Sequence, residues 1–226
     1  MIYSITFVLA FCSIVYELLL GQALSAFLGN TVLRYSVTIG LYMLSMGVGA
    51  LIAEGRFVNR PVISLLLVET LLTLIGGSSI VLLFVVNAQG VSPALISVVA
   101  HGLIIVIGIL SGFEIPLLIQ LKSFAEKNKD NAIIGVNYLG AFLGTVVFAL
   151  ILYPYAGIVM AAFMVALSNA LVGVALVTQS KHVESNERIL FYLLLIVELA
   201  LVLALAYCLI TSDHISETLL NTYLGV

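Results

Sequence analysis

Long apolar stretches, separated by short polar segments, fill almost the whole sequence. A helix needs about 20 apolar residues to cross the ~30 Å hydrocarbon core of a bilayer. Seven stretches approach or exceed this length, at residues 3–27, 35–53, 62–86, 94–121, 132–153, 157–177 and 189–210. We therefore predict an all-α integral membrane protein with a seven-span domain at 1–210 and a short tail at 211–226. The short connection after residue 153 further predicts a tight antiparallel hairpin of the fifth and sixth spans.

Composition agrees with this pattern and excludes several functions. The 226 residues are 63% apolar and 8% charged, whereas soluble domains carry about 25% charged residues. The sequence has no glycine-rich nucleotide motif, no metal-spaced cluster, no catalytic Ser-His-Asp set and no basic patch for nucleic acid. We therefore expect no cofactor, no metal, no nucleic-acid partner and no catalysis by this chain alone. Cys12 and Cys208 both lie in apolar runs and are expected to pack rather than to pair.

The basic residues predict an orientation. Seven of the eight Lys and Arg residues follow the second, fourth and sixth spans, namely Arg56, Arg60, Lys122, Lys127, Lys129, Lys181 and Arg188. Only Arg34 falls on the other side. Because loops rich in Lys and Arg stay in the cytoplasm, we expect an inner (plasma) membrane protein with a cytoplasmic N-terminus and an external C-terminus.

Four of the eleven acidic residues lie inside the apolar stretches, and no basic residue does. They are Glu17, Glu69, Glu114 and Glu198. A charged side chain at membrane depth costs about 2.5–3.5 kcal/mol on insertion scales, so such residues usually face a bundle interior or a wet cavity. Without basic partners, these acids are protonated, hydrogen-bonded or matched by a mobile cation. Polar packing is the alternative, most of all for Glu69 and Glu198, which lie nearer the span ends.

Two of these acids have the most polar surroundings. Glu17 follows Tyr16 and shares a helix face with Ser13, four residues earlier. Glu114 precedes Pro116, which removes a backbone donor and is expected to kink the helix and free carbonyl groups. We predict that Glu17 and Glu114 converge on one polar cavity.

Glycine pairs mark expected helix contacts. Gly108 and Gly112 in the fourth span, and Gly140 and Gly144 in the fifth, each line up on one helix face. Small residues at this spacing let backbones approach closely. Asn137 and Tyr138 lie about one turn before the second pair. They are candidates for hydrogen bonds to a ligand, with helix packing as the alternative.

The second and fifth spans also resemble each other in sequence. Ile39, Gly40, Leu44 and Gly49 align with Ile134, Gly135, Leu139 and Gly144 at one offset, and Glu17 aligns with Glu114 at nearly the same offset. This alignment predicts a three-plus-three inverted repeat with one added helix, as in many transporter halves. Chance matches among Leu, Ile and Gly are the alternative.

Three motifs together carry a family resemblance. They are Tyr-Glu-Leu-Leu-Leu-Gly at 16–21, Gly-Phe-Glu-Ile-Pro-Leu-Leu at 112–118, and Asn-Tyr-Leu-Gly-Ala at 137–141 followed by Tyr-Pro at 153–154. In order and spacing the chain resembles the N-terminal membrane domain of membrane-bound spermidine synthase-like proteins. The resemblance implies a link to polyamines and a soluble, Rossmann-like aminopropyltransferase domain after the membrane domain. The chain departs from it in having Asn137 where an aspartate is expected, and in stopping at Val226.

These observations lead to one functional expectation and two alternatives. The leading expectation is a bilayer protein that binds or transports a cationic solute, a polyamine by the resemblance. Its expected ligand-binding residues are Glu17, Glu114, Tyr16, Asn137, Tyr138, Glu69 and Glu198. The first alternative is the non-catalytic membrane module of a spermidine synthase-like enzyme, acting with a synthase domain or subunit. The second is a structural subunit whose acids only pack.

Overall fold

The computed structural model describes residues 1–55, 57–124, 130–212, 214–215 and 217–218. This part of the chain is helical and contains no strand. Its elements are α1 (Ile2–Leu28), α2 (Thr31–Ala53), α3 (Pro61–Ala88), α4 (Pro93–Ser123), α5 (Asp130–Val147), η1 (Phe148–Ala156), α6 (Gly157–Ala175), η2 (Leu176–His182) and α7 (Arg188–Ile210). The predictions on Arg56, Lys127, Lys129 and most of the tail at 211–226 lie outside the described residues.

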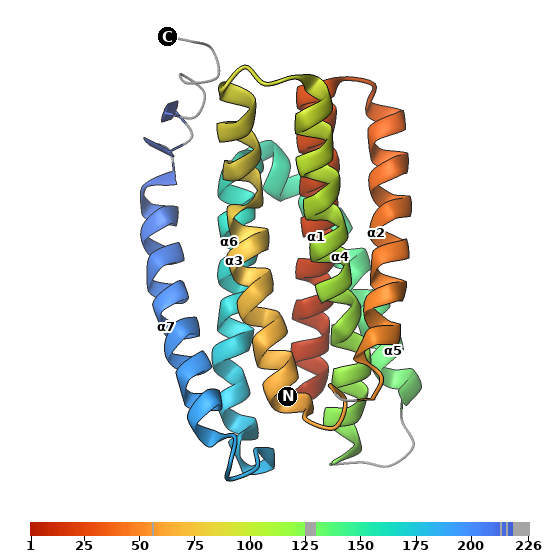
Figure 1. Cartoon of the computed structure of the whole chain (residues 1–226), viewed down its shortest axis with the longest axis vertical. Coiled ribbons are helices and arrows are strands. Elements are labelled where there is room, and N and C mark those ends of the chain that lie inside the picture. Colours follow the sequence, from red (N-terminus) through yellow and green to blue (C-terminus); the bar gives the residue numbers. More distant parts are fainter. Residues whose placement is uncertain (56, 125–129, 213, 216, 219–226) are drawn as a thin grey trace.

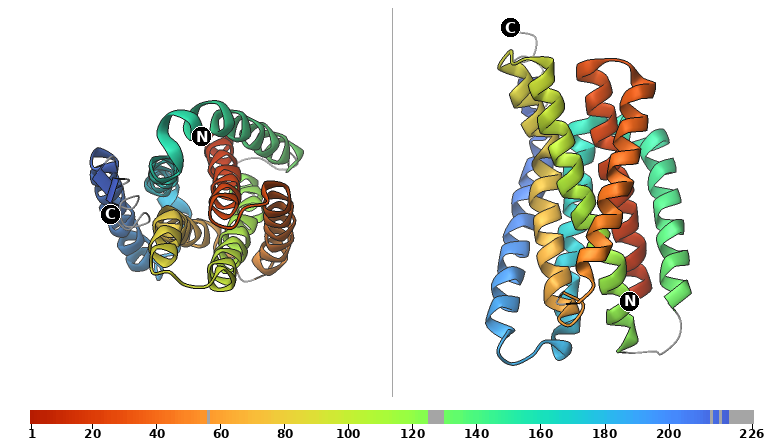
Figure 2. Two further views of the ribbon diagram at one scale, coloured as in Figure 1. Left: turned by 90° about the horizontal axis from the view of Figure 1, so that it is seen from above. Right: turned by 45° about the vertical axis from the view of Figure 1, so that its right-hand side comes forward.

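The all-helical class is confirmed, but seven separate spans are not supported. Six helices of the described chain are long and apolar enough to cross a membrane, judged by length and composition. The predicted fifth and sixth spans form one of these six, a 52-residue run from Asn131 to His182. The run stays helical because η1 is a wide π-helical turn that includes Pro154 and closes at Gly157, which has a φ of 71°. Within this run the chain reverses direction at η1 (Figure 2).

The predicted fifth and sixth spans are antiparallel as expected, but the tight packing predicted between them is wrong. Helix α5 packs mainly against α1, whereas α6 packs against α3, α7 and α1. The view along the bundle shows α5 turning away from α6 and lying beside α1 (Figure 2). The reason is that the broad turn of η1 separates the two helices, and the glycines of α5 fit the backbone of α1 instead.

Helix α1 lies at the centre of the bundle, and α7 lies at its edge (Figure 1). In their most apolar segments, 67% of α1 is buried against only 17% of α7. Large apolar side chains are exposed on the outer faces of α2, α5 and α7, for example Met43, Phe142 and Leu203. The bundle therefore carries an apolar core inside an apolar surface.

The prediction that these glycines lie at helix contacts is confirmed. A Cβ added at Gly112 would lie 2.8 Å from the carbonyl carbon of Met46 on α2, and one at Gly108 would lie 2.8 Å from the Cβ of Ser45. On α5, Gly140 contacts the backbone of Phe7, and a Cβ at Gly144 would lie 2.9 Å from the carbonyl oxygen of Phe11. Only a residue without a side chain allows these helices to approach so closely.

The two ends of the bundle differ in charge. The start of α1 and the connections after α2, α4 and α6 lie at the same end, and α7 runs toward the other (Figure 1). Four of the basic residues described, Arg60, Lys122, Lys181 and Arg188, belong to that end, whereas Arg34 belongs to the opposite one. An ion pair between Arg60 and Glu187 links two of these connections. We call this the basic end of the bundle.

Candidate functional site

A small polar cavity lies between α1, α2, α4 and α5. Its volume is about 60 Å³, and its lining residues are Ala10, Ser13, Ile14, Glu17, Met46, Ser111, Glu114, Ile115, Asn137 and Ala141. The prediction that Glu17 and Glu114 face one polar cavity is therefore confirmed, and Asn137 joins them. A role of these three residues in binding remains a prediction.

Tyr42 holds one wall of this cavity together. Its hydroxyl lies 3.0 Å from the Ser13 hydroxyl and 2.9 Å from the Ser111 hydroxyl, and it donates to the Ser13 carbonyl oxygen at 3.0 Å. The Tyr42 side chain is fully buried. A single phenol on α2 thus connects α1 and α4 at the cavity. Tyr42 was not predicted as a site residue, because only the fold brings its hydroxyl to Ser13 and Ser111.

The two cavity carboxylates have surroundings that suit water. Within the described part of the chain, neither Glu17 nor Glu114 makes a hydrogen bond, and Glu114 Oε1 is fully buried. A water molecule needs about 10–15 Å³ of such space and two to four polar partners. A cavity of about 60 Å³ lined by two carboxylates, two serines and an asparagine fits a few waters. Small-molecule sites have volumes of about 300–1,000 Å³, so this cavity is too small for one.

The other two acids form a second polar cluster between α3, α6 and α7. The Thr70 hydroxyl donates to Glu198 Oε1 at 2.8 Å, and the Asn169 amide donates to the Glu69 carbonyl oxygen at 3.3 Å. Glu69 and Glu198 are both fully buried, so neither side chain extends to the end of the bundle. Gly173 makes room for the Glu198 carboxylate, since a Cβ there would lie 2.6 Å from its Cδ. These two predicted site residues do not line the cavity of Glu17 and Glu114.

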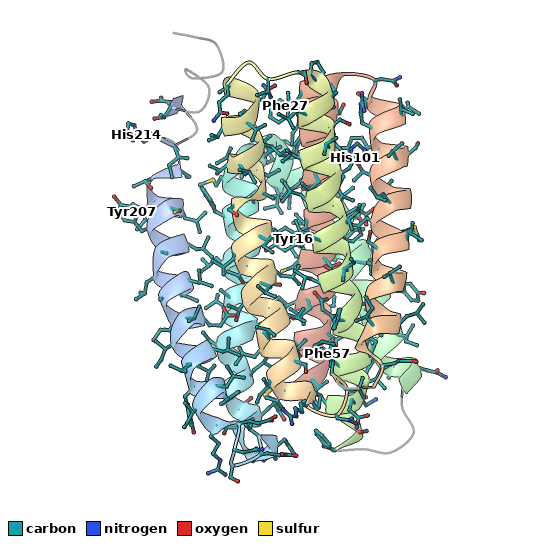
Figure 3. The ribbon with its side chains drawn as sticks, in the orientation of Figure 1. Tyr16, Phe27, Phe57, His101, Tyr207 and His214 are labelled. Carbon is teal, nitrogen blue, oxygen red and sulfur yellow. The ribbon has the colours of Figure 1, made fainter. Side chains whose placement is uncertain are left out.

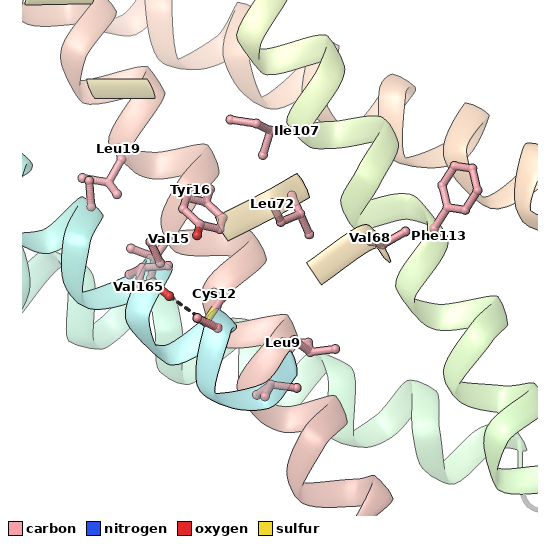
Figure 4. Close-up of a cluster of buried hydrophobic side chains, with 14 of the residues drawn as sticks. Leu9, Cys12, Val15, Tyr16, Leu19, Val68, Leu72, Ile107, Phe113 and Val165 are labelled. Atoms are coloured by element: carbon pink, nitrogen blue, oxygen red, sulfur yellow. Dashed lines mark hydrogen bonds between the residues drawn. The ribbon is translucent and has the colours of Figure 1, made fainter. Parts of the chain in front are cut away.

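Two further predicted site residues point away from the cavity. Tyr16 lies at mid-height of the bundle (Figure 3), where it faces α3, and a Cβ at Gly76 would lie 2.6 Å from its ring. It belongs to a buried apolar cluster with Val15, Leu72 and Cys12 (Figure 4). Tyr138 is 70% exposed on the outer face of α5. Neighbours in sequence lie about 100° apart around a helix, so Tyr16 and Tyr138 turn away where Glu17 and Asn137 turn inward.

The two cysteines are unpaired thiols. Cys12 and Cys208 are both free, and the Cys12 thiol donates to the Val165 carbonyl oxygen at 3.7 Å. No group of three or more His, Cys, Asp or Glu side chains could hold a metal ion among the residues described.

Comparison with known proteins gives the chain its relatives. It is 37% identical over 177 residues to a polyamine aminopropyltransferase 1 of Streptomyces coelicolor, which covers 76% of this chain and 32% of that protein. It is 33% identical to polyamine aminopropyltransferases of Oceanobacillus iheyensis, over 74% of this chain, and Leptospira interrogans, over 77%. The chain is thus related to spermidine synthase-like proteins and spans about a third of the length of these curated relatives. No protein-family model matches it. No solved structure matches it.

These relatives overturn the leading functional expectation. They are named as enzymes of aminopropyl transfer, not as transporters or binders of a cationic solute. The acid-only interior suggested a mobile cation because no basic side chain neutralises it. The structure offers another explanation for three of these acids, since the cavity beside Glu17 and Glu114 has room for water and the Thr70 hydroxyl donates to the Glu198 carboxylate.

Proposed function

We propose that this chain is the helical, membrane-embedded module of a polyamine aminopropyltransferase enzyme, and that the module itself is non-catalytic. The observation that carries this proposal is the alignment of three quarters of the chain with about a third of each polyamine aminopropyltransferase. The transfer of the aminopropyl group is then catalysed by the remaining, larger part of the enzyme, which is a further domain or a partner subunit. The module holds that catalytic part at the membrane.

The surface and the ends of the bundle support a bilayer as its surroundings. In the part of the chain that the structure describes, six helices have the length and apolarity of membrane spans. Large apolar side chains on the outer faces of α2, α5 and α7 suit contact with lipid tails. Because Lys and Arg are retained in the cytoplasm, we place the basic end at the cytoplasmic face of the inner membrane.

The packing supports the further proposal of an inverted repeat. Helices α2 and α3 of the first half both pack on α4, the first helix of the second half. Correspondingly, α5 and α6 of the second half both pack on α1, the first helix of the first half. Helices α1 and α4 run in opposite directions (Figure 1), as an inverted repeat requires. The cavity region draws on equivalent positions of the two halves, namely Glu17 with Glu114, Tyr42 with Asn137, and Met46 with Ala141.

The proposal is tested by following enzyme activity with the tagged protein in its native cells. Membranes are washed with alkaline carbonate, solubilised in mild detergent and passed over an affinity resin for the tag. We expect the protein to stay in the washed membranes. The eluate, supplied with an aminopropyl donor and a diamine acceptor, should move the aminopropyl group from the donor to an amine of the diamine. The resulting triamine is detected by mass spectrometry.

Matched variants separate anchoring from catalysis. The double variant Gly112→Leu with Gly144→Leu disrupts two helix contacts, so it should lower the amount of activity recovered with the membranes. Gly102→Leu adds the same side chain on α4 where nothing lies within 4 Å, and it should leave recovery unchanged. An eluate that carries the tagged protein in full amount but no aminopropyltransferase activity would refute the proposed function.

A further inference from the structure

A cleft at the basic end of the bundle collects positive charge. Its volume is about 240 Å³, and it lies between the start of α1, the end of α4, and η2. The polar and aromatic residues that line it are Tyr3, Lys122, Phe124, Gln179, Lys181 and His182. No acidic side chain contributes to this lining among the residues described. The cleft therefore favours an anion.

Its basic groups are positioned by aromatic neighbours. The Lys122 ammonium lies 4.8 Å from the centroid of the Tyr3 ring, and this lysine is only 3% exposed. The His182 ring stacks on Phe124 with centroids 4.8 Å apart and an interplanar angle of 13°. Lys181 is exposed beside them. These contacts hold the Lys122 ammonium and the His182 ring in place at the cleft.

An apolar groove lies next to this cleft on the side of the bundle, and the two share Met1 in their linings. Its volume is about 420 Å³, and it runs between the first turns of α1 and the last turns of α6. Its lining includes Ile5, Val8, Leu171, Val172 and Ala175. Met1 borders both the groove and the cleft. The Thr178 hydroxyl lies 3.0 Å from the Met1 sulfur and holds this side chain at the junction.

We propose that the cleft and the groove together bind one anionic phospholipid, with its phosphate headgroup in the cleft and an acyl chain along the groove. Basic pockets between membrane helices on the cytoplasmic side bind anionic headgroups. A soluble phosphate compound would use only the cleft, whereas the adjoining groove adds an apolar surface that fits a hydrocarbon chain. The inference rests on the proposed placement of the basic end at the cytoplasmic face of a membrane.

Lipid binding to the purified protein tests the headgroup part. The probe is phosphatidylglycerol with a fluorescent acyl chain, titrated in mild detergent, and its competitors are unlabelled phosphatidylglycerol, phosphatidylcholine and glycerol phosphate. Only phosphatidylglycerol should compete well. Lys181→Gln should weaken binding about fivefold, since one Lys or Arg near an anionic surface contributes about that factor. Arg188→Gln removes a charge at the same end but outside the cleft, and it should leave binding unchanged.

A second pair of variants tests the groove. Ser168 lines the groove, so Ser168→Phe should fill it and weaken binding of the two-chain lipid. Met164→Phe adds an aromatic ring on α6 outside the groove and is the matched control. The inference is overturned if phosphatidylcholine binds equally well, or if glycerol phosphate competes as well as the lipid. Equal effects of Lys181→Gln and Arg188→Gln would also overturn it. Loss of the protein from carbonate-washed membranes would instead refute the proposed membrane placement.

Discussion

The close approach of α4 to α2 at Gly112 gives a sharp test of this packing. A Cβ added there would lie 2.8 Å from the carbonyl carbon and 2.9 Å from the Cα of Met46 on α2. Carbon atoms attract best at about 3.5–4.0 Å. Alanine at this position therefore forces the two helices apart, and the contact is backbone, which cannot turn aside as a flexible side chain can.

The expected size of the effect follows from two opposing contributions. Adding carbon atoms to a well-packed site costs about 1–3 kcal/mol. Alanine in place of glycine in a helix returns up to about 1 kcal/mol through its better helix propensity. We expect Gly112→Ala to lower the free energy of unfolding by about 1 kcal/mol, and Gly112→Leu by about 3 kcal/mol. Gly102→Ala on the same helix meets nothing within 4 Å, so it should keep or slightly raise stability.

Unfolding of the detergent-solubilised protein measures this difference. The variants are titrated with denaturing detergent, and loss of helicity is followed by circular dichroism under identical conditions. The order of stability should be Gly102→Ala, then the unchanged protein, then Gly112→Ala and Gly112→Leu. If Gly112→Ala proves as stable as Gly102→Ala, the close contact of α4 with α2 is not present in solution.

Three more results are expected. Tyr42→Phe removes a hydroxyl that hydrogen-bonds with two serines, so it should lower the free energy of unfolding by about 0.5–1.5 kcal/mol. Tyr138→Phe is the control, because Tyr138 is 70% exposed and its variant should have no effect. Equal effects of the two variants would contradict the hydrogen bonds of Tyr42 at the cavity. Gly173→Ala should destabilise the bundle in the same unfolding assay because its Cβ would lie 2.6 Å from a buried carboxylate of α7, and a neutral result would argue against that contact. In intact cells, a membrane-impermeant maleimide should label Gln89→Cys, which lies at the end opposite the basic end, but not Ser185→Cys, which lies at the basic end. The reverse pattern would contradict the proposed orientation.

The helices were largely predictable from the sequence because their ends carry explicit signals. Pro61 and Pro93 begin α3 and α4 in the structure, each at the first turn where proline fits a helix. Asn30 caps α2 through a bond from the Leu33 backbone amide. The relation of the fifth and sixth spans was not predictable. A short connection with Pro154 and Gly157 shows where the chain turns, but not how widely, and here the π-helical turn carries α5 away to α1.

The candidate site was predictable in its acids but not in its geometry. A carboxylate in an apolar run stands out by its cost, so Glu17 and Glu114 could be found from the sequence. The helices are apolar all round, so hydrophobicity does not reveal which face turns inward. For that reason Tyr16 was expected at the cavity although it faces α3. Tyr42 was overlooked because only the fold brings its hydroxyl to the serines of α1 and α4.

The arrangement of buried polar groups explains how such a module would keep one structure in a bilayer. In lipid, apolar side chains do not favour helix contacts over lipid contacts, so small residues and polar bonds decide which helices pair. Among the residues described, the hydroxyl of Tyr42 links α2 to α1 and α4. Hydrogen bonds of Thr70 with Glu198 and of Asn169 with the Glu69 carbonyl oxygen link α3 to α7 and α6. These bonds involve α1, α2, α3, α4, α6 and α7, whereas α5 is placed by the close fit of Gly140 and Gly144 against α1. Removing one partner from such a bond leaves the other buried and unsatisfied, so each bond disfavours alternative pairings of the helices that it links. Of the four buried acids, only Glu198 accepts a hydrogen bond through its carboxylate among the residues described, and this bond from Thr70 helps to join α7 to α3.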